Sequence, residues 1–491
     1  MVVYQRDVEG AVPSLFRMVV VSYYTHINTE NYIMKRKSIV KWLMLFVITL
    51  SLLIPVSIAE SVPASDTVRV AVAVSGSSME FVTHGEYQIV EQRNGNVIAQ
   101  LGSNERWRVE NRDGWLFMYG PGNILGPYGG TLAVQSSSAV TASVIAGEGN
   151  ILDRVSIRGM KVRDTFGNTV TLADQDRLRV LSATGTGELA MAGNETFLLS
   201  LSANSLNTRY RGDILFMIED GTLMAVNRLN VEDYLRGVIA AEMPSTWPEE
   251  ALKAQAVTSR TYAMHMAGES KESAYDLTSD QYTQMYRGYD GEYSSTSKAV
   301  QDTTGVVMLN HGKPVQAYFH SSSGGYTENS EDVWLTPLPS IKARIDSYDI
   351  NDAHYNWQVY YSAYQLTDRF RNSASFKSIS NINCVYTDTG TRVREMTVIG
   401  LDYDDRPLQI KISNADRVRT TLGLKSALFR MDKTFDEYNN LSGVRLTGSG
   451  FGHGLGMSQY GARGMALEGY DYRDILRFYF TDIVVVGNYG E

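Results

Sequence analysis

The sequence predicts an α+β protein, in which a region of short strands precedes a mixed module of short strands and several helices. Apolar and polar residues alternate along much of residues 68–205, as they do in half-buried strands. No segment before Val231 has the convincing spacing of a helix, and the later strands do not alternate with helices as βαβ units do. We expect an N-terminal extension with a signal peptide over residues 1–59, a β-rich accessory region over residues 60–205 and the mixed module over residues 206–491.

The first 59 residues have the features of a targeting segment. Basic residues in Met34–Lys37 precede Trp42–Ala59, eighteen residues without charge, and Ser57–Ala59 provides a small-x-small cleavage site. Residues 1–33 fit no signal pattern, and we hypothesise that translation starts at Met34. An uncleaved signal is the alternative, because eighteen residues approach the length of a membrane span. In both cases we expect the body to be extracytoplasmic, secreted or in the cell envelope, with the membrane touched only through an uncleaved signal.

The accessory region contains six segments with the alternating pattern of strands. Val68–Val74, Tyr87–Gln92, Val97–Leu101 and Arg106–Glu110 are expected to be short strands, and Val155–Val170 and Arg177–Val180 continue the alternating pattern. Turn residues separate several of them, at Asn94–Gly95, Asp113–Gly114 and Gly129–Gly130. This region can bind a ligand or only pack against the next module, and the sequence does not choose between the two.

The mixed module begins with a hairpin over Tyr210–Asn227, whose turn is Asp220–Gly221. A second hairpin is expected from Val306–Leu309 and Val315–Phe319, around Asn310–Gly312. Other predicted elements are helices over Ser294–Thr303 and Tyr472–Phe480, a helix-like Met457–Ala466, and strands over Phe376–Val385, Arg392–Ile399, Gln409–Ile412 and Ile483–Val486.

Charge and cysteine content restrict the kinds of partner. The chain of 491 residues has room for about two or three domains, and its 43% of hydrophobic residues is typical of a globular protein. A net charge of −9 without a basic run after residue 60 argues against a nucleic-acid partner. Cys384 is the single cysteine, so an intrachain disulfide and a cysteine cage for zinc are both excluded. We interpret Cys384 as a small buried hydrophobic residue rather than a reactive thiol.

The segment Asn230–Met264 contains the most informative residue of the chain. Apolar side chains fall at helical spacing at Val231, Tyr234, Leu235 and Val238. Gly237 can end that turn, and Thr246–Glu249 fits a capping box for a second helix. Glu242 is expected between the two helices, flanked by small and apolar residues. Burial there can raise the pKa of its carboxyl group and make it a general acid, although a surface or capping glutamate is the alternative.

Four segments resemble one family, in the family's order. They are Asn230–Met264, Gln316–Thr327 (QAYFHSSSGGYT), Asn414–Phe429 (NADRVRTTLGLKSALF) and Gly448–Ala466 (GSGFGHGLGMSQYGARGMA). The chain resembles, from about Arg209 to its C-terminus, the stage II sporulation protein D / amidase enhancer family of bacterial cell-wall proteins. The resemblance implies a peptidoglycan lytic transglycosylase, which cleaves glycan strands and leaves 1,6-anhydro ends. It says little about residues 60–205, which can bind wall polymer or only pack.

The family's catalytic glutamate matches Glu242. One carboxyl group suffices because it protonates the glycosidic oxygen and then deprotonates the attacking 6-hydroxyl of the muramic acid. We expect substrate-binding residues at Arg260, Ser321, Ser322, Ser323, Gly325, His453, Gln459 and Tyr460. The alternatives are a solvated ion pair for Arg260, a polar turn for the serine-glycine segment, and a tight turn with a packed histidine for the glycine-rich segment.

The resemblance also bears on metals and partners. Some family members have proposed zinc ligands in the segment that matches Asp276–Tyr286, which here reads DLTSDQYTQMY without Cys or His. We predict no zinc and no other cofactor. The expected partners are peptidoglycan glycan strands and a cell-wall amidase. Two other functions stay open, a non-catalytic modulator that enhances an amidase and a structural envelope protein in which Glu242 supports two helices.

Overall fold

A computed structural model describes the backbone and side chains of most of the chain. The residues described are 67–137, 197–203, 206–350, 352–371 and 373–487, and between residues 138 and 196 only strands are described. The chain divides into two compact units, one with Met1–Val62 and Ala142–Met191, the other with Pro63–Thr141 and Ala192–Glu491. The signal peptide and the start at Met34 lie outside the described residues. Where the chain is described, no helix has both the length and the hydropathy needed to cross a bilayer.

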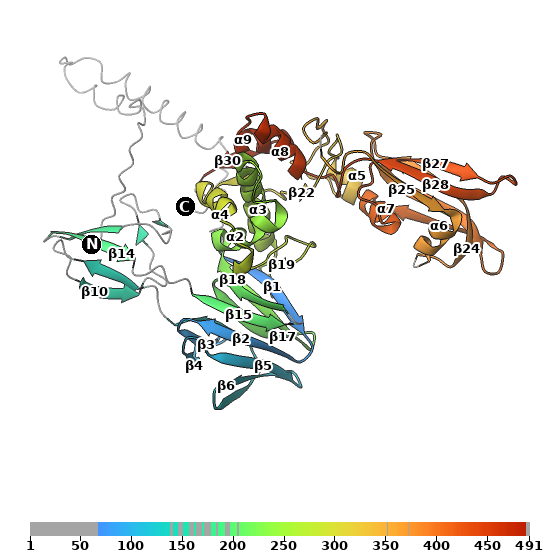
Figure 1. The fold of residues 1–491 in the computed structure, drawn as a ribbon. Coiled ribbons are helices and arrows are strands. Elements are labelled where there is room, and N and C mark those ends of the chain that lie inside the picture. Colours follow the sequence, from blue (N-terminus) through green and yellow to red (C-terminus); the bar gives the residue numbers. More distant parts are fainter. Residues whose placement is uncertain are drawn as a thin grey trace, which may run out of the picture. The chain divides into compact units, whose positions relative to one another are not determined.

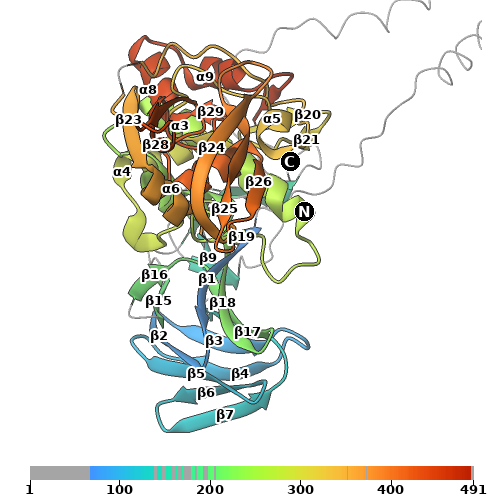
Figure 2. The same cartoon turned by 90° about the vertical axis from the view of Figure 1, so that its right-hand side faces the viewer.

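Two mainly antiparallel sheets form the first part of the larger unit (Figures 1 and 2). In spatial order, the seven-stranded sheet consists of β19 (Leu277–Thr278), β1 (Thr67–Ser75), β18 (Thr222–Asn230), β17 (Asp213–Glu219), β8 (Leu132–Ser136), β3 (Tyr87–Glu91) and β4 (Val97–Leu101). The six-stranded sheet consists of β16 (Leu206–Tyr210), β15 (Leu198–Ala203), β2 (Ser78–His84), β5 (Arg106–Arg112), β6 (Trp115–Gly120) and β7 (Asn123–Tyr128).

One hydrophobic core joins the two sheets. Along β2 every second side chain is buried, including Met79 and Phe81, which is the period-two pattern of a half-buried strand. The rings of Phe81 and Phe216 lie 5.5 Å apart and connect β2 of one sheet with β17 of the other. The same core continues into the helices through residues such as Tyr234 and Leu235.

The boundary expected at residue 205 falls inside this core. Strand β1 pairs with β18 along its whole length, and β8 pairs with β17. The predicted hairpin of β17 and β18 is confirmed, with Asp220 and Gly221 both at positive φ in its two-residue turn. The hairpin therefore completes a sheet that the preceding region begins, and it starts no separate domain.

Five helices of the larger unit form a cluster, in which four pack around α3. They are α2 (Val231–Glu242), α3 (Glu249–Glu269), α4 (Ser294–Asp302), α8 (Gln459–Leu467) and α9 (Tyr472–Tyr479). Helix α3 contacts each of the other four. Every residue from Ala254 to Met264 is buried, as expected of a helix that is covered on all sides.

Two local predictions about these helices are wrong. Gly237 does not end a helical turn, because α2 continues to Glu242 and Gly237 lies inside it. Thr246 forms no capping box, since Pro248 is the N-cap residue of α3 and no side chain caps it. The carboxylate of Glu249 instead pairs with Lys253 and Lys298.

Short elements connect the helices. They are η1 (Tyr289–Gly291), α5 (Ser330–Trp334), a sheet of β21 (Lys313–Pro314), β20 (Val307–Asn310) and β30 (Val484–Val486), and a parallel pair of β22 (Phe319–His320) and β29 (Met457–Ser458). The second predicted hairpin is correct in its turn, but its second strand ends at Pro314 because Phe319 pairs with Met457 instead. That parallel pair brings the serine-glycine segment beside the glycine-rich segment.

Residues 357–448 form a second module with a core of its own. Its sheets are β23 (Trp357–Ser362), β28 (Leu441–Gly448) and β27 (Phe429–Phe435), and β24 (Phe376–Tyr386), β25 (Val393–Asp402) and β26 (Pro407–Ser413). Helices α6 (Ala363–Phe370) and α7 (Ala415–Leu422) pack against them. Cys384 is partly buried against this core, and burial raises the pKa of its thiol to about 11, as expected of an unreactive cysteine.

The smaller unit contains the remaining described strands. They are β9 (Thr141–Ile145), β10 (Ile151–Ser156), β11 (Val162–Arg163), β12 (Thr169–Val170), β13 (Leu178–Ser182) and β14 (Gly185–Met191). Strands β10, β9, β14 and β13 form one sheet, and β11 pairs with β12. The α+β class is confirmed, because helices and mainly antiparallel sheets occur together in the described part of the chain.

Candidate active site

Glu242 is the last residue of α2, and its side chain is mostly buried. The N–H of Met285 donates to Glu242 Oε1 at 2.7 Å. This hydrogen bond lowers the pKa of the carboxyl group, but desolvation has the larger effect and raises the pKa to about 7. Glu242 is therefore a carboxylic acid that still holds its proton near neutral pH, the property required of a general acid.

The start of α8 reaches the backbone of Glu242. Gln459 Nε2 lies 3.2 Å from the carbonyl oxygen of Glu242 and 3.4 Å from Gln255 Oε1, and donates to both. The next residue, Tyr460, packs its ring at 4.9 Å from that of Trp247. The glycine-rich segment and the acid are thus neighbours, although they are more than 200 residues apart in sequence. Of the predicted site residues, Gln459 contacts the backbone of Glu242, and Tyr460 packs against Trp247, five residues after the acid.

His453 packs among other rings in the glycine-rich segment. Its Nδ1 accepts a hydrogen bond from the N–H of Leu455 at 3.0 Å. The rings of Trp334 and His320 lie 4.9 and 5.5 Å from it. Burial lowers the pKa of His453 to about 4, so its ring is neutral near pH 7. These contacts agree with the alternative of a packed histidine that shapes the loop.

The serine-glycine segment is built around a buried carboxylate. Ser322 and Ser323 donate their hydroxyl groups to Asp349 Oδ2 at 3.0 and 2.8 Å, and the N–H of Gly324 donates to the same oxygen at 3.0 Å. Ser322 and Ser323 are 1% and 0% exposed, which supports the alternative of a polar turn, and their predicted contact with a substrate stays a prediction. Ser321 is partly exposed, and its carbonyl accepts from the N–H of Tyr460.

Gly325 is buried, and its role is one of backbone conformation. Its φ of 101° is one that other residues rarely adopt. Its N–H donates to Ser323 Oγ at 3.2 Å, and its carbonyl accepts from Asp346. A Cβ at Gly325 would lie 3.3 Å from the hydroxyl of Tyr355. These contacts support a turn rather than the expected direct contact with a saccharide.

The contacts of Arg260 support a structural ion pair, and its predicted role in substrate binding stays a prediction. Its side chain is 0% exposed and pairs bidentately with Glu232, through Nε at 2.8 Å and Nη2 at 2.6 Å. The remaining donors reach the carbonyl oxygens of Val300 and Val306. All of its directed contacts are internal, because a buried guanidinium must have its N–H groups paired.

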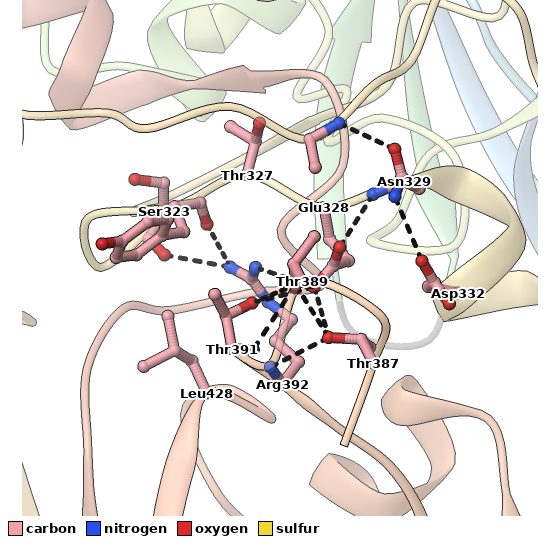
Figure 3. A network of polar contacts seen from close by, with 12 residues as sticks. Ser323, Thr327, Glu328, Asn329, Asp332, Thr387, Thr389, Thr391, Arg392 and Leu428 are labelled. Atoms are coloured by element: carbon pink, nitrogen blue, oxygen red, sulfur yellow. Dashed lines mark hydrogen bonds and ion pairs between the residues drawn. The ribbon is translucent and has the colours of Figure 1, made fainter.

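A network that sequence reasoning missed fixes the serine-glycine segment to the second module (Figure 3). Glu328 is fully buried, and its Oε2 accepts from three threonine hydroxyls at 2.8–2.9 Å, those of Thr387, Thr389 and Thr391. Arg392 Nη2 donates to the carbonyl oxygens of Ser323 and Tyr326 at 2.9 and 2.7 Å. The segment TDTGTR at residues 387–392, with its alternating threonines and one arginine, is the sequence signal from which this network could have been predicted.

The glycine-rich segment closes over this network. A Cβ at Gly454 would lie 2.4 Å from the guanidinium carbon of Arg392, so only glycine fits there. The N–H of Glu328 donates to the carbonyl of Gly454 at 2.8 Å. Asp276–Tyr286, the segment without Cys or His, contributes the Met285 N–H that holds Glu242. In the described part of the chain, no group of three or more His, Cys, Asp or Glu residues is placed to hold a metal ion.

Comparison with known proteins decides the family. Residues 219–310 match the family model described as Stage II sporulation protein, SpoIID. "Stage II sporulation protein D" of Bacillus subtilis is 30% identical over 274 residues, which are 52% of this chain and 74% of that protein. The chain belongs to the SpoIID family. An uncharacterized protein of Brachyspira hyodysenteriae is 33% identical over 285 residues, 56% of this chain and 72% of that protein.

Other similarities of this SpoIID-family chain add detail. The "Amidase enhancer" of Bacillus subtilis is 31% identical over 293 residues, which are 50% of this chain and 39% of that protein. Residues 337–456 match a second family model, described as a domain of unknown function. The SpoIID match contains α2, α3 and Glu242, whereas the second match contains the module of residues 357–448 and residues 448–456 of the glycine-rich segment.

Proposed function

We propose that this SpoIID-family protein is a secreted peptidoglycan lytic transglycosylase. It would cleave the bond between N-acetylmuramic acid and N-acetylglucosamine and leave 1,6-anhydro ends, in cell-wall remodelling or sporulation. One observation carries the proposal: the mostly buried Glu242 carboxyl group has a pKa of about 7, and the N–H of Met285 donates to it, while Gln459 of the glycine-rich segment donates to the backbone carbonyl of the same residue. Such an acid is half protonated at the pH where a cell-wall enzyme works.

The chemistry balances with a single carboxyl group. Protonated Glu242 donates its proton to the glycosidic oxygen, and the bond from that oxygen to the anomeric carbon of the muramic acid breaks. The 6-hydroxyl of the same muramic acid attacks the anomeric carbon from within the sugar. Its proton passes to the Glu242 carboxylate, which restores the acid. No water is consumed, and no second carboxylate is needed.

The Met285 N–H has a defined part in this cycle. It stabilises the carboxylate that exists between the two proton transfers, because it donates to Oε1 at 2.7 Å. Desolvation acts in the other direction and favours the protonated acid. With both influences, the pKa stays near neutrality, which suits a group that must give and take a proton in one turnover.

A second function is favoured by the similarity to the amidase enhancer. In that alternative the chain binds wall glycan without cleaving it and stimulates an N-acetylmuramoyl-L-alanine amidase. Both functions place the protein outside the cytoplasm with peptidoglycan as its partner. They differ in whether new anhydro ends appear when the protein acts alone.

Digestion of purified glycan strands, with and without stem peptides, tests the proposal. Mass spectrometry of the products should find 1,6-anhydro-muramic ends with the wild type and none with Glu242→Gln. Glu249→Gln is the matched control, because Glu249 is an exposed carboxylate at the start of α3, seven residues after Glu242, and its loss should leave the products unchanged. Equal product from wild type and Glu242→Gln contradicts catalysis by Glu242. No product from either, together with acceleration of an amidase, supports the modulator.

A further inference from the structure

A closed network of hydrogen bonds holds Glu242 at two points. At one point, the N–H of Met285 donates to Glu242 Oε1 at 2.7 Å. At the other point, Gln459 Nε2 donates to the carbonyl oxygen of Glu242 at 3.2 Å. Three buried side chains connect these two points, those of Gln255, Ser259 and Gln284. We call these six residues the Glu242 network.

The connection between the two points runs through helix α3. Gln459 Nε2 also donates to Gln255 Oε1 at 3.4 Å, and Gln255 Nε2 donates to Ser259 Oγ at 2.9 Å. Gln255 and Ser259 are four residues apart in α3, so they lie on the same face of the helix. The carbonyl oxygen of Ser259 accepts from Gln284 Nε2 at 3.3 Å, and Gln284 directly precedes Met285. The network thus returns to the carboxyl group from which it started.

The three connecting side chains are polar although they are fully buried. Gln255, Ser259 and Gln284 are each 0% exposed, and a buried amide or hydroxyl costs free energy unless it is hydrogen-bonded. The hydroxyl of Tyr234 donates to Gln284 Oε1 at 3.1 Å, so both ends of this amide are bound. An amide has both a donor and an acceptor, so each glutamine connects one neighbour to the next. An ionised carboxylate or an apolar side chain cannot do so.

The other titratable groups on the surrounding elements keep one protonation state near neutral pH. Burial raises the pKa of three phenols above 10, one on α2, one on α3 and one beside Met285: Tyr234, Tyr262 and Tyr286. Arg260, the buried cation of α3, pairs with Glu232, and the guanidinium of Arg463 on α8 lies over an indole ring. The protonation of Glu242 therefore depends on its desolvation and on the Met285 N–H.

The network leaves one oxygen of Glu242 for the proton. The Met285 N–H donates to Oε1, and among the described residues no hydrogen bond reaches Oε2. An oxygen that carries the proton is the poorer acceptor, so the neutral acid keeps its proton on Oε2. Two fixed points, one on the carboxyl group and one on the backbone, thus determine which oxygen can deliver a proton and where it lies.

We propose that Gln284 is a positioning residue, which keeps the Met285 N–H on Glu242 Oε1. Gln255 extends this hold to the glycine-rich segment through Gln459. The part of the network in proton transfer rests on the proposed function. Without the Gln284 side chain, the Met285 N–H is free to turn away, and the carboxylate loses the donor that stabilises it. The Glu242 side chain also becomes less precisely placed, which reduces kcat rather than raising KM.

Carbon-13 NMR of protein labelled at the glutamate carboxyl carbon tests this role in the free protein. The signal that is missing from Glu242→Gln identifies Glu242, and its titration is followed from pH 5 to 9. Gln284→Met has a similar volume but no amide. It should raise the pH at which Glu242 titrates by about one pH unit, because a carboxylate loses a hydrogen-bond donor. Gln255→Met should give a smaller rise, although Gln255 contacts neither Glu242 nor Met285.

Kinetics with glycan strands provide the second measurement. Gln284→Met should lower kcat about tenfold and change KM less than about twofold. The pH at which kcat/KM declines should move upward together with the titration of Glu242. A variant that only lost stability would keep the wild-type titration and pH profile in its folded fraction.

Tyr286→Phe is the matched control, because the Tyr286 hydroxyl donates to Asn227 Oδ1 at 2.8 Å and fixes the same segment from outside the network. It should leave the titration of Glu242 unchanged. Equal rises with Gln284→Met and Tyr286→Phe would mean that any loosening of the segment acts on the acid, and would overturn the proposal. No change with Gln284→Met would overturn it too, and no change with Gln255→Met would overturn the closed network.

Two further comparisons keep the test decisive. If Gln284→Met does not fold, Tyr234→Phe removes only the hydroxyl that binds Gln284 Oε1, and it should give a smaller rise in the same direction. If the titration responds as expected but the wild type releases no anhydro ends, the proposed catalytic function fails while the positioning role stands. If the titration does not respond while Glu242→Gln abolishes cleavage, the positioning role fails and catalysis by Glu242 stands.

Discussion

The surroundings of Glu242, rather than its residue type, determine the pKa of its carboxyl group. The chain has many glutamates, and Glu249, seven residues away, has a pKa lowered to about 2 by hydrogen bonds from Lys253 and Lys298. Burial gives Glu242 the opposite shift, to about 7. The two groups show how neighbouring carboxyl groups acquire different protonation states at the same pH.

The first prediction concerns the pH dependence of activity. A general acid must be protonated, so kcat/KM on peptide-free glycan should decline as pH rises through about 7, the pKa of Glu242. Above that value the decline should approach tenfold per pH unit. Rates measured between pH 5 and 9 test this, and a profile that stays level to pH 9 would contradict the assignment of the acid.

The second prediction concerns stability. The folded pKa of Glu242 is raised from 4.5 to about 7, so the folded state binds the proton more tightly, and stability is lost as pH rises between these values. Glu242→Gln does not ionise, so its stability relative to the wild type should increase over this range by up to about 3 kcal/mol. Urea unfolding at pH 4.5 and pH 8 measures the difference.

Glu249→Gln provides the contrasting case. The folded pKa of Glu249 is lowered to about 2, so its ionised form stabilises the fold above pH 4.5 and that contribution is lost as pH falls through about 2. The effect should have the opposite sign and be small, because Glu249 is exposed and its ion pairs are screened. Identical pH responses of the two variants would exclude a special environment for Glu242.

Arg260 tests the distinction between a binding residue and a structural one. Arg260→Met leaves the Glu232 carboxylate with the N–H of Gly305 as its described partner, and should cost about 3–5 kcal/mol in unfolding free energy. The KM of the remaining folded protein should not change. Arg236→Met, which removes a 3.7 Å surface pair with Asp233, should cost less than about 1 kcal/mol. A stable Arg260→Met protein with a raised KM would support the substrate-binding role.

At the scale of elements, α2 and its glycine show what the sequence pattern leaves undetermined. Gly237 lies in the middle of a helix, where glycine is unfavourable by about 1 kcal/mol relative to alanine. A Cβ there would lie 2.7 Å from the carbonyl oxygen of Gly288 and from the ring of Tyr286. Tertiary packing, rather than helix termination, explains this glycine.

Gly237→Ala should therefore destabilise the protein by about 1–3 kcal/mol, although alanine is the better helix former. Gly268→Ala is the matched control, because Gly268 lies in α3 with nothing within 4 Å of a Cβ. That change should be neutral or stabilising by up to about 1 kcal/mol. Thermal unfolding of both variants gives the comparison, and stabilisation by Gly237→Ala would refute the packing argument.

Local sequence patterns predict the positions of strands and turns well, but they do not predict which distant strands pair with each other. The strands at Tyr87–Glu91 and Val97–Leu101 and the turn at Asp220–Gly221 follow from alternation and turn chemistry, which are properties of neighbouring residues. The pairing of Phe319 with Met457 depends on residues 138 positions apart, and no pattern in either segment encodes it. The start of α3 after Pro248 was also predicted wrongly, because Glu249 forms an ion pair with Lys253 and no capping box is present.

Some residues of the candidate site could likewise be predicted from motifs, whereas others are recognised only in the folded structure. Glu242, Gln459 and Tyr460 could be named from motifs and lie together. The serines could be named too, but not their partner Asp349, because a buried carboxylate is recognised only once its donors are in place. His354 lies in no motif, and Lys425, although it lies in the resembling segment Asn414–Phe429, was not predicted to be a site residue. The contacts of His354 with Tyr460 and with Lys425 follow from the fold alone.

At the scale of the whole molecule, the seven-stranded sheet of the larger unit determines which segments of the chain must fold together. Residues before and after position 205 contribute neighbouring strands, and Val68, Phe81 and Tyr87 share one core with Tyr234 and the helices. The compact unit that includes Ala142–Met191 is separate by its contacts. We therefore expect the accessory region to contain one part that the fold requires and one part that can be removed.

Two deletions distinguish these parts. A chain that begins at residue 206 lacks β1 and β8, so β17 and β18 would expose both edges and an apolar face, and we expect it to aggregate rather than fold. A chain in which a flexible Gly/Ser linker replaces Ala142–Met191 keeps every strand of both large sheets and should unfold cooperatively, close to the stability of the parent. Circular dichroism with urea titration measures both, and cleavage of peptide-free glycan should survive only in the second. A folded, active chain from residue 206 would show that the shared sheet is not required for folding. Failure of the linker chain to fold would show that the smaller unit is required.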